Sequence, residues 1–305
     1  MKSSIVSYPA RGNYGKSSWR GNTTGHIIKE LLLDYRPRVF VDPAEGSQTS
    51  RDVANELQNS GWDLQYHGFD LHSGFNLLKD SLSERLQGVR SDFVFFHPPY
   101  HSMVVYSGIE DGGIWGEQPH PDDLSRCASY EDFLCKMRIA LFNIYETVKP
   151  GGNYSILVGD VRKNGLYLSL QADLMQLAPG ALEGVIIKAQ HNCVSDRRVY
   201  GGKFTPINHE YLLNFRKDSC TFALLDATLT VSRRLQKLAQ ANWRATIRQA
   251  LGALGGVAPL ARIYEWIEAT ARETVKTRLN WKARVRAELQ THFRNVERGV
   301  WAIPC

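Results

Sequence analysis

The first 227 residues alternate short apolar runs with longer segments of helical spacing, and this alternation most narrows the possible folds. Apolar runs suited to strands lie at 38–41, 64–69, 92–96, 154–158, 184–189 and 210–215. Helical spacing occupies 49–59, 130–147 and 166–177, and a Lys-Pro-Gly-Gly segment closes the second helix. Strands that alternate with helices predict an α/β fold with a largely parallel sheet.

The last 78 residues have a different pattern and a different charge. Residues 228–305 hold 14 lysines and arginines against 5 acidic residues, whereas residues 1–227 hold 23 against 26. Helical patterns at 242–254, 259–271 and 280–293 precede a short hairpin at 295–303. Three helices and a hairpin are typical of a winged helix, whose third helix can enter a DNA major groove. We predict domains at 1–227 and 228–305, the second binding nucleic acid; a solvated arginine-rich face is the alternative.

Composition excludes several classes of protein. Apolar residues make up 43% of the chain and charged residues 22%, as in globular domains. No run approaches the length of a membrane span, and no hydrophobic run follows Lys2, so we expect neither a membrane segment nor a secretory signal. The five cysteines are scattered without a CxxC pair, so we expect no metal site, no disulfide framework and a cytoplasmic location.

An acidic turn with a glycine, Asp42–Thr49, follows the first predicted strand and opens a helix. Doubly wound sheets hold a nucleoside at such a turn. Asp70 follows Gly46 by 24 positions and ends the next predicted strand, where a carboxylate can take ribose hydroxyls. The turn lacks the GxGxxG pattern of dinucleotide enzymes, which disfavours NAD. An ordinary strand-to-helix turn remains the alternative.

A buried strand at 92–96 stops at His97-Pro98-Pro99-Tyr100. The two prolines fix the backbone and remove two amide donors, which leaves carbonyl acceptors at the strand end. Tyr100 comes directly after them and is placed to stack on a planar ligand. Residues 107–123 hold four glycines and two prolines, and we interpret them as a mobile loop beside this strand.

Taken together, these segments resemble the S-adenosylmethionine-dependent DNA amino-methyltransferases. His97–Tyr100 is similar to their Asp/Asn/Ser-Pro-Pro-aromatic motif, and Asp42–Thr49 is similar to their DPFxGSGT cofactor motif. Further similar segments lie at 13–22, 149–152, 159–160 and 209–213, so the resemblance covers roughly residues 12–217. Cofactor motifs come first and the recognition region last, which is the gamma order, found mostly in adenine-N6 enzymes.

The resemblance implies a Rossmann-like class I methyltransferase fold with a mostly parallel seven-stranded sheet, S-adenosyl-L-methionine as cofactor and double-stranded DNA as partner. The target base would be flipped out of the duplex, in a bacterial, archaeal or phage-infected cell with a restriction-modification system as one setting. The implied catalytic residues are His97, Pro98, Pro99 and Tyr100. The implied cofactor-binding residues are Asn13, Trp19, Gly21, Asn22, Asp42, Pro43, Glu45, Gly46, Ser47, Thr49 and Asp70.

The tail from Trp281 to Trp301 resembles winged-helix modules attached to bacterial restriction and modification proteins. Its candidate DNA contacts are Lys282, Arg284, Arg286 and Arg298. Arg197, Arg198 and Lys203 lie in a basic segment with Tyr and Gly, and with Trp115 they are candidates to hold the displaced strand.

Two departures from the family pattern carry their own predictions. Gln48 stands where the cofactor motif has Gly, and we expect it to crowd the cofactor unless the turn opens. His97 stands where the family has Asp, Asn or Ser. A neutral imidazole can accept a hydrogen bond from the target amine and an imidazolium cannot, so turnover should fall below about pH 6.5.

The reaction that this interpretation favours is methyl transfer to adenine N6 in DNA. The alternatives are cytosine-N4 methylation, an RNA or protein-glutamine methyltransferase, and a DNA-binding protein whose methyltransferase body is silenced by His97 and Gln48.

Overall fold

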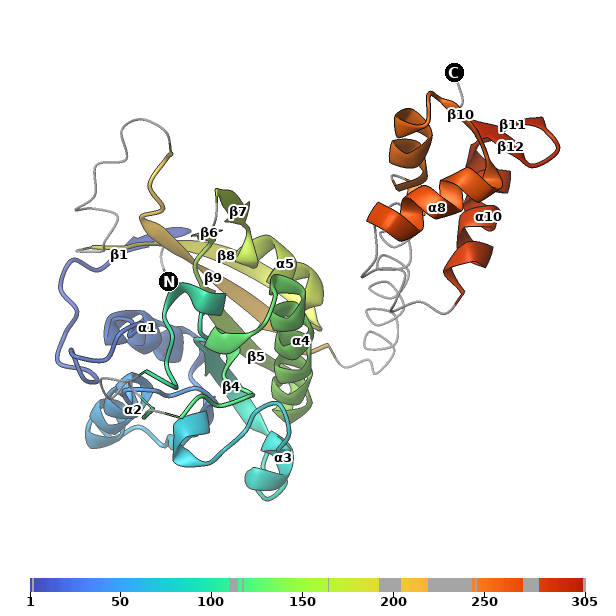
Figure 1. Cartoon of the computed structure of the whole chain (residues 1–305). Coiled ribbons are helices and arrows are strands. Elements are labelled where there is room, and N and C mark those ends of the chain that lie inside the picture. Colours follow the sequence, from blue (N-terminus) through green and yellow to red (C-terminus); the bar gives the residue numbers. More distant parts are fainter. Residues whose placement is uncertain are drawn as a thin grey trace. The chain divides into compact units, whose positions relative to one another are not determined.

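The computed structural model describes residues 1, 3–109, 115–116, 118–163, 165–191, 204–218, 243–244, 246–270 and 280–303 (Figure 1). Internal contacts divide the chain into two compact units, Met1–Leu225 and Asp226–Cys305. The candidate DNA contacts Arg197, Arg198 and Lys203 lie outside the described residues. Among the described helices, none has both the length and the apolar character to cross a membrane.

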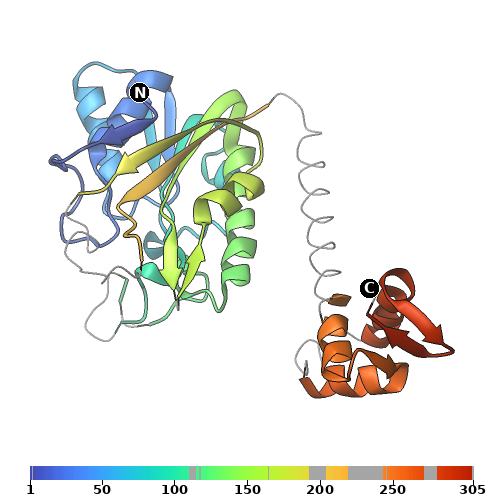
Figure 2. The same ribbon diagram turned by 90° about the horizontal axis from the view of Figure 1, so that it is seen from above.

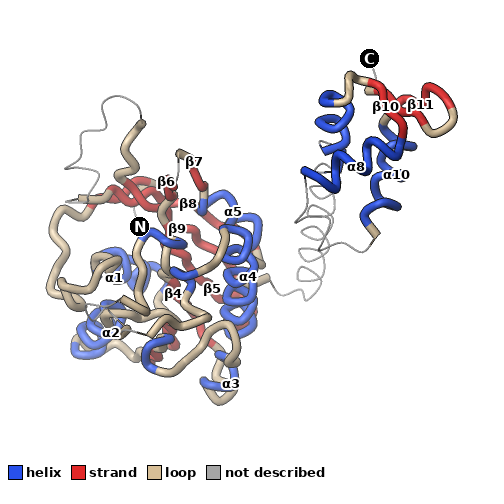
Figure 3. Tube along the Cα trace, viewed as in Figure 1, coloured by secondary structure: helices blue, strands red, loops and turns tan. Residues whose placement is uncertain are grey.

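The first unit is built on a seven-stranded sheet in the order β1-β8-β9-β5-β4-β2-β3. Figure 3 draws its strands in red, with helices in blue around them. The strands are β1 (Ile5–Ser7), β2 (Val39–Asp42), β3 (Gln65–Gly68), β4 (Ser91–Phe96), β5 (Val148–Val158), β8 (Ala181–Ala189) and β9 (His209–Arg216). β9 runs antiparallel to both neighbours, β5 and β8, and the other pairs are parallel. This confirms the predicted α/β class with a mostly parallel sheet, the Rossmann-like arrangement that the resemblance implied.

Helices cover both faces of this sheet, and the interior strand β4 is apolar on both sides. Along β4, Phe93 and Phe95 pack with the buried residues of α1 (Gly25–Tyr35) and α2 (Thr49–Asn59). Val94 and Phe96 point the other way, toward α4 (Tyr130–Thr147) and α5 (Leu170–Leu177). The two-residue period of the strand thus makes two cores, and Figure 2 shows the blue and green helices on opposite sides of the sheet.

Several helix and strand boundaries follow the sequence prediction and others correct it. α2 and α4 have the predicted ends; Ser129 caps α4 by accepting a hydrogen bond from the Asp132 amide. The predicted helix at 166–177 is wrong in its first part: residues 166–168 form β7 (Leu166–Leu168), which pairs with β6 (Val161–Lys163). The Lys-Pro-Gly-Gly segment lies inside β5, at a register shift opposite β4. α3 (Leu82–Arg85) is a single short turn.

The described part of the second unit contains a three-stranded antiparallel sheet and helices. β12 (Val300–Ala302) pairs with β10 (Val257–Pro259) on one side and with β11 (Arg294–Glu297) on the other. Helical backbone within 243–253 precedes α8 (Leu260–Thr270) and α10 (Trp281–His292). Their inward side chains, Ile247, Ile263, Val285 and Leu289 among them, form a separate core.

Candidate active site

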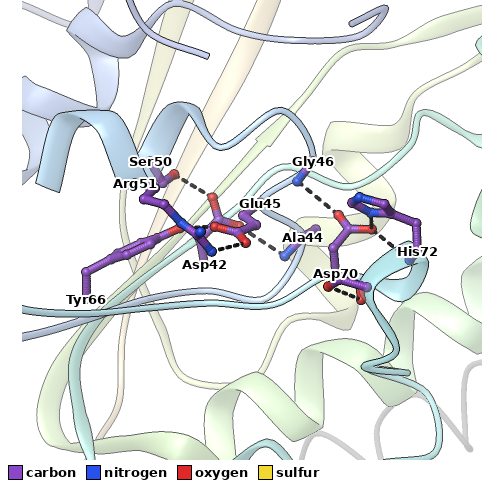
Figure 4. Close-up of polar contacts among 10 residues, drawn as sticks. Asp42, Ala44, Glu45, Gly46, Ser50, Arg51, Tyr66, Asp70 and His72 are labelled. Atoms are coloured by element: carbon purple, nitrogen blue, oxygen red, sulfur yellow. Dashed lines mark hydrogen bonds and ion pairs between the residues drawn. The ribbon is translucent and has the colours of Figure 1, made fainter. Parts of the chain in front are cut away.

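The turn after β2 is organised around a buried carboxylate, Asp42. Its Oδ1 accepts a hydrogen bond from the Ala44 amide at 3.0 Å, and its Oδ2 accepts one from the Ser50 hydroxyl at the start of α2 (Figure 4). Burial raises the pKa of Asp42 to about 7, and the nearby charges of Glu45 and Asp70 act in the same direction. Asp42 therefore ties β2 to α2 and supports the turn from inside.

Glu45 binds protein groups of its own. One carboxylate oxygen accepts a hydrogen bond from the Arg51 guanidinium at 2.6 Å, and the other accepts one from the Tyr66 hydroxyl of β3 at 2.9 Å (Figure 4). Both donor–acceptor distances are in the range of hydrogen bonds to a carboxylate. Glu45 thus holds the turn against α2 and β3 while its side chain borders the pocket described below.

Asp70 joins the same turn to the end of β3. Its Oδ2 accepts a hydrogen bond from the Gly46 amide at 2.9 Å, and its Oδ1 accepts from the His72 amide at 3.1 Å (Figure 4). His72 Nδ1 lies 2.7 Å from Oδ1, and this hydrogen bond raises the pKa of His72. Each carboxylate oxygen has two lone pairs, so Asp70 keeps acceptor capacity beyond these bonds.

The N-terminal segment lies over this turn. The indole Nε1 of Trp19 comes within 3.2 Å of the point where a Cβ on Gly46 would stand. Asn22 Oδ1 accepts a hydrogen bond from the Thr49 hydroxyl at 2.6 Å. Gly21 has a φ of 77°, and a Cβ there would collide with the Tyr106 hydroxyl, so only glycine fits.

These elements surround one pocket, whose empty space is about 770 Å³ when the part open to solvent is included. The predicted residues that line it are Trp19, Gly21, Asn22, Pro43, Glu45, Gly46, Ser47, Asp70, His97 and Pro99. Asp42, Thr49, Pro98 and Tyr100 are not among the lining residues. Asn13 lines a different hollow, with Tyr14, His26 and Glu56. The structure therefore brings most cofactor candidates and two catalytic candidates to a single site.

Sequence reasoning did not identify the rest of the lining. The missed residues are apolar Ala44, Leu71, Phe75, Leu77, Leu78, Phe96 and Leu124, polar Asn76 and Asp122, and aromatic Tyr106. Trp115 also lines the pocket, whereas the sequence indicated a contact to the displaced strand. Trp115 stacks on Tyr106 at 5.3 Å and on His72 at 6.0 Å between ring centroids. The apolar residues after Asp70 were the available signal for residues 71–78. These residues form a short helical turn and a loop, so their apolar positions follow neither a helical nor a strand period.

The expected crowding of the pocket by Gln48 is not found in the structure. Its side chain is exposed and is not among the lining residues. Its backbone instead has the left-handed conformation that favours glycine, with φ 69° and ψ 26° at the start of α2. A non-glycine residue in this left-handed region is strained, so the replacement burdens the backbone rather than the ligand space.

His97 is one end of a chain of polar side chains that is partly buried at His97 and Tyr100 and buried at Glu210 and Lys188. Its Nε2 lies 2.8 Å from the Tyr100 hydroxyl oxygen, and that hydroxyl donates to Glu210 Oε1 of β9 at 2.6 Å. Lys188 of β8 donates to Glu210 Oε2 at 2.5 Å. The Tyr100 ring lies against Gly159 at the end of β5, where a Cβ would come within 3.0 Å of it.

Burial lowers the pKa of His97 to about 4, although the negative charge of Glu210 opposes this shift. His97 is therefore neutral at physiological pH, as an acceptor must be. The expected loss of turnover below about pH 6.5 is corrected accordingly: the protonation of His97 belongs near pH 4.

In the second unit, the basic candidates are exposed but do not share one side of their helix. Trp281, Val285 and Leu289 mark the buried face of α10. Lys282 and Arg286 are one turn apart on one flank, and Arg284 projects from the other flank. The Lys282 ammonium lies 5.4 Å from the Trp281 ring centroid and 5.6 Å from that of Tyr264. Arg298 is exposed in the turn between β11 and β12.

Comparison with known proteins gives the following likenesses. No family model matches the sequence, and no curated protein matches it. Among solved structures, a candidate DNA modification methylase from Thermus thermophilus is 20% identical over 60% of this chain and 53% of that chain, with a TM-score of 0.30. A candidate class I S-adenosylmethionine-dependent methyltransferase from Listeria monocytogenes is 19% identical over 65% and 60%, with a TM-score of 0.37.

TrmN from Thermus thermophilus is 14% identical over 65% of this chain and 50% of that chain, with a TM-score of 0.35. The matched part spans between about half and three fifths of each of these three solved chains. At such identities and TM-scores, the likenesses say nothing about activity.

Proposed function

We propose that the protein is an S-adenosylmethionine-dependent methyltransferase that acts on an exocyclic amine of a base in DNA, adenine N6 first. One observation carries the proposal: Gly46 and Asp70, the candidate nucleoside contacts, line the same pocket as His97 and Pro99. A cofactor held by the first pair is thereby confined beside the second pair.

The pocket fits this cofactor in its chemistry. Leu71, Phe75 and Leu124 offer an apolar surface for a purine ring, and Oδ2 of Asp70 has one free lone pair for a ribose hydroxyl. Asp70 gives the pocket an acidic side chain, which suits a positively charged sulfonium and amino group, whereas the charge of Asp122 is paired with Lys79 at 2.5 Å. The Trp115 indole N–H is buried with no partner among the described residues, and a bound ligand can satisfy it.

When bound, S-adenosylmethionine supplies an electrophilic methyl group on a positively charged sulfur. The chain's own residues prepare the amine that receives it. An amine conjugated to its ring is a poor nucleophile, and hydrogen-bond acceptors on its N–H groups make its lone pair available. Neutral His97 is one such acceptor, and the Pro98 carbonyl is the other in this proposal.

Cofactor binding tests the first half of the proposal. Asp70→Asn should weaken the binding of S-adenosylmethionine by about tenfold or more in calorimetric titration. The side-chain nitrogen of the asparagine cannot accept a hydrogen bond from a ribose hydroxyl. Asp63→Asn is the matched control, since Asp63 is exposed and pairs with Arg38. Equal affinity in the two variants would remove Asp70 from the cofactor site.

A substrate panel tests the second half. We expect label from S-adenosylmethionine to enter double-stranded DNA, and nucleoside mass spectrometry to find N6-methyladenine. N4-methylcytosine would keep the mechanism and change the base. Label in RNA or in protein glutamine, with none in DNA, would replace the proposed substrate. Cofactor binding without transfer to any of these would indicate a silenced enzyme.

A further inference from the structure

A buried ion pair joins two neighbouring strands and is connected to His97 through Tyr100. Neither of its residues lines the pocket. Lys188 and Glu210 face each other directly in the register of β8 and β9. Their side chains are 8% and 7% exposed, and their charged atoms lie 2.5 Å apart. Removing two charges from water is costly unless further hydrogen bonds compensate, so such a pair calls for an explanation.

The direction of every hydrogen bond in this chain follows from its donors and acceptors. The Lys188 ammonium can only donate, and the ionised Glu210 carboxylate can only accept. Despite burial, the positive charge of Lys188 keeps the pKa of Glu210 below its ordinary value, so the carboxylate stays ionised. The single proton of the Tyr100 hydroxyl therefore points at Glu210 Oε1, 2.6 Å away.

Tyr100 then has only a lone pair to offer on its other side. His97 Nε2, 2.8 Å from the Tyr100 oxygen, must carry a proton to form a hydrogen bond there. A neutral imidazole holds one proton on its two nitrogens, so Nδ1 is left without one. The distant carboxylate thus decides which nitrogen of His97 can accept.

We propose, on the basis of the proposed function, that Lys188, Glu210 and Tyr100 are positioning residues which hold His97 with its proton on Nε2 and present Nδ1 as the acceptor for the target amine. The reaction then balances as follows. The amine nitrogen forms a bond to the methyl carbon with its lone pair, and the carbon–sulfur bond breaks with its electrons left on sulfur. One N–H bond of the product breaks, its electron pair stays on nitrogen, and its proton moves to Nδ1.

Burial disfavours the resulting imidazolium, and the negative charge of Glu210 offsets part of this cost. Its Nε2–H still donates to Tyr100, whose hydroxyl donates to Glu210. Solvent takes up the proton from Nδ1 when the product leaves. A carboxylate or an amide in place of His97 has no two ring nitrogens, so there would be no tautomer for such a chain to select.

Nitrogen NMR of the full chain with ¹⁵N-labelled histidine tests the tautomer directly, without cofactor or DNA. The His97 signals are those lost in His97→Asn. At pH 7.5 we expect Nε2 to show the shift of a protonated nitrogen and Nδ1 that of an unprotonated one. The reverse assignment in the wild-type protein would overturn the proposal.

Glu210→Gln gives the sharper result. Lys188 needs an acceptor, so the Gln carbonyl should turn to Lys188 and its NH₂ group to Tyr100. Tyr100 would then donate to His97 Nε2, and the His97 proton should move to Nδ1. A merely structural role for Glu210 predicts no such exchange, so an unchanged tautomer in folded Glu210→Gln would also overturn the proposal.

Two further variants complete the design. Glu183→Gln is the matched control, because Glu183 lies on β8, is exposed and pairs with Arg216; it should leave the His97 signals as in the wild type. Tyr100→Phe removes one oxygen, so it should fold even where Glu210→Gln does not. In it the His97 proton should distribute over both nitrogens, and a wild-type tautomer there would contradict the proposal.

Activity gives an independent readout. Glu210→Gln should lower kcat by about 10²-fold or more, the usual contribution of a positioned acid–base group. KM for S-adenosylmethionine should stay the same, because Glu210 does not line the pocket. A protein that shows the expected tautomers but methylates nothing would refute the proposed function and keep the hydrogen-bond chain, so the two failures can be told apart.

Discussion

Replacing His97 with asparagine should make unit 1 less sensitive to acid, and the size of this effect follows from the pKa of His97. The pKa is 6.5 in an unfolded chain, and burial lowers it to about 4 in the folded protein. Below pH 6.5 the unfolded state binds a proton that the folded state refuses, so wild-type stability is lost as the pH falls toward 4. Asparagine does not titrate, and the variant keeps an oxygen acceptor at the same place.

Between pH 7.5 and pH 5, these two pKa values imply a loss of about 2 kcal/mol from the wild-type free energy of unfolding that the variant should not share. Urea unfolding of the full chain at both pH values measures it. Pulsed hydrogen exchange of the peptide that contains Ser91–Phe96 reports unit 1 separately from unit 2. His191→Asn, which removes an exposed imidazole, supplies the baseline.

A difference between wild type and His97→Asn that stays constant from pH 7.5 to pH 5 would refute this reasoning. It would mean that His97 is hydrated and protonates as a free histidine does. The neutral acceptor at physiological pH, and with it the buried environment assigned to the site, would then have to be abandoned.

Three other predictions concern the cofactor turn and the second unit. Asp42, whose pKa of about 7 compares with 3.8 when unfolded, titrates in the opposite sense: stability is lost as the pH rises, so Asp42→Asn should gain about 2–3 kcal/mol more over wild type at pH 8 than at pH 5 in urea unfolding. Gln48→Gly should relieve the left-handed strain and gain about 0.5–1 kcal/mol in thermal unfolding, whereas Gln48→Ala should gain nothing. Alanine at both Lys282 and Arg286 should reduce the salt slope of DNA binding by about 1.8, and alanine at the exposed, Glu265-paired Arg262 should leave the slope unchanged.

The helices with complete periodicity were predictable from the sequence. α2 and α4 begin and end where expected because their buried residues repeat at helical spacing between clear boundaries. α1 was missed although Ile27, Ile28, Leu31 and Leu32 repeat at helical spacing after the N-cap Thr24. The signal for this helix is therefore present in the sequence and was overlooked.

The other missed elements have weak signals. β1 and β10 have three residues each and are mostly exposed, so neither has an apolar pattern, and their partners are distant in the sequence. β7 was predicted as helix because Leu166, Leu168 and Leu170 continue into the apolar residues of α5. Only the pairing with β6 separates the two elements.

The candidate site was predictable where its residues belong to local motifs. The Asp42–Thr49 turn, Asp70 and His97 were found because each lies at the carboxyl end of a strand. Lys188 and Glu210 were beyond this reasoning, because they meet only through the register of β8 and β9 and belong to no motif of their own. The resemblance marked 209–213 as a segment but assigned no role to Glu210.

The most direct test of the central claim is methylation of unmethylated DNA at pH 8 with labelled S-adenosylmethionine, comparing wild type, His97→Ala and His97→Asn by nucleoside mass spectrometry. We predict N6-methyladenine from the wild type, none from His97→Ala, and partial activity from His97→Asn, whose amide oxygen can accept from the amine. Equal yields from wild type and His97→Ala would contradict His97 as the acceptor, and a wild-type protein that binds S-adenosylmethionine but leaves DNA unlabelled would contradict the proposed function itself.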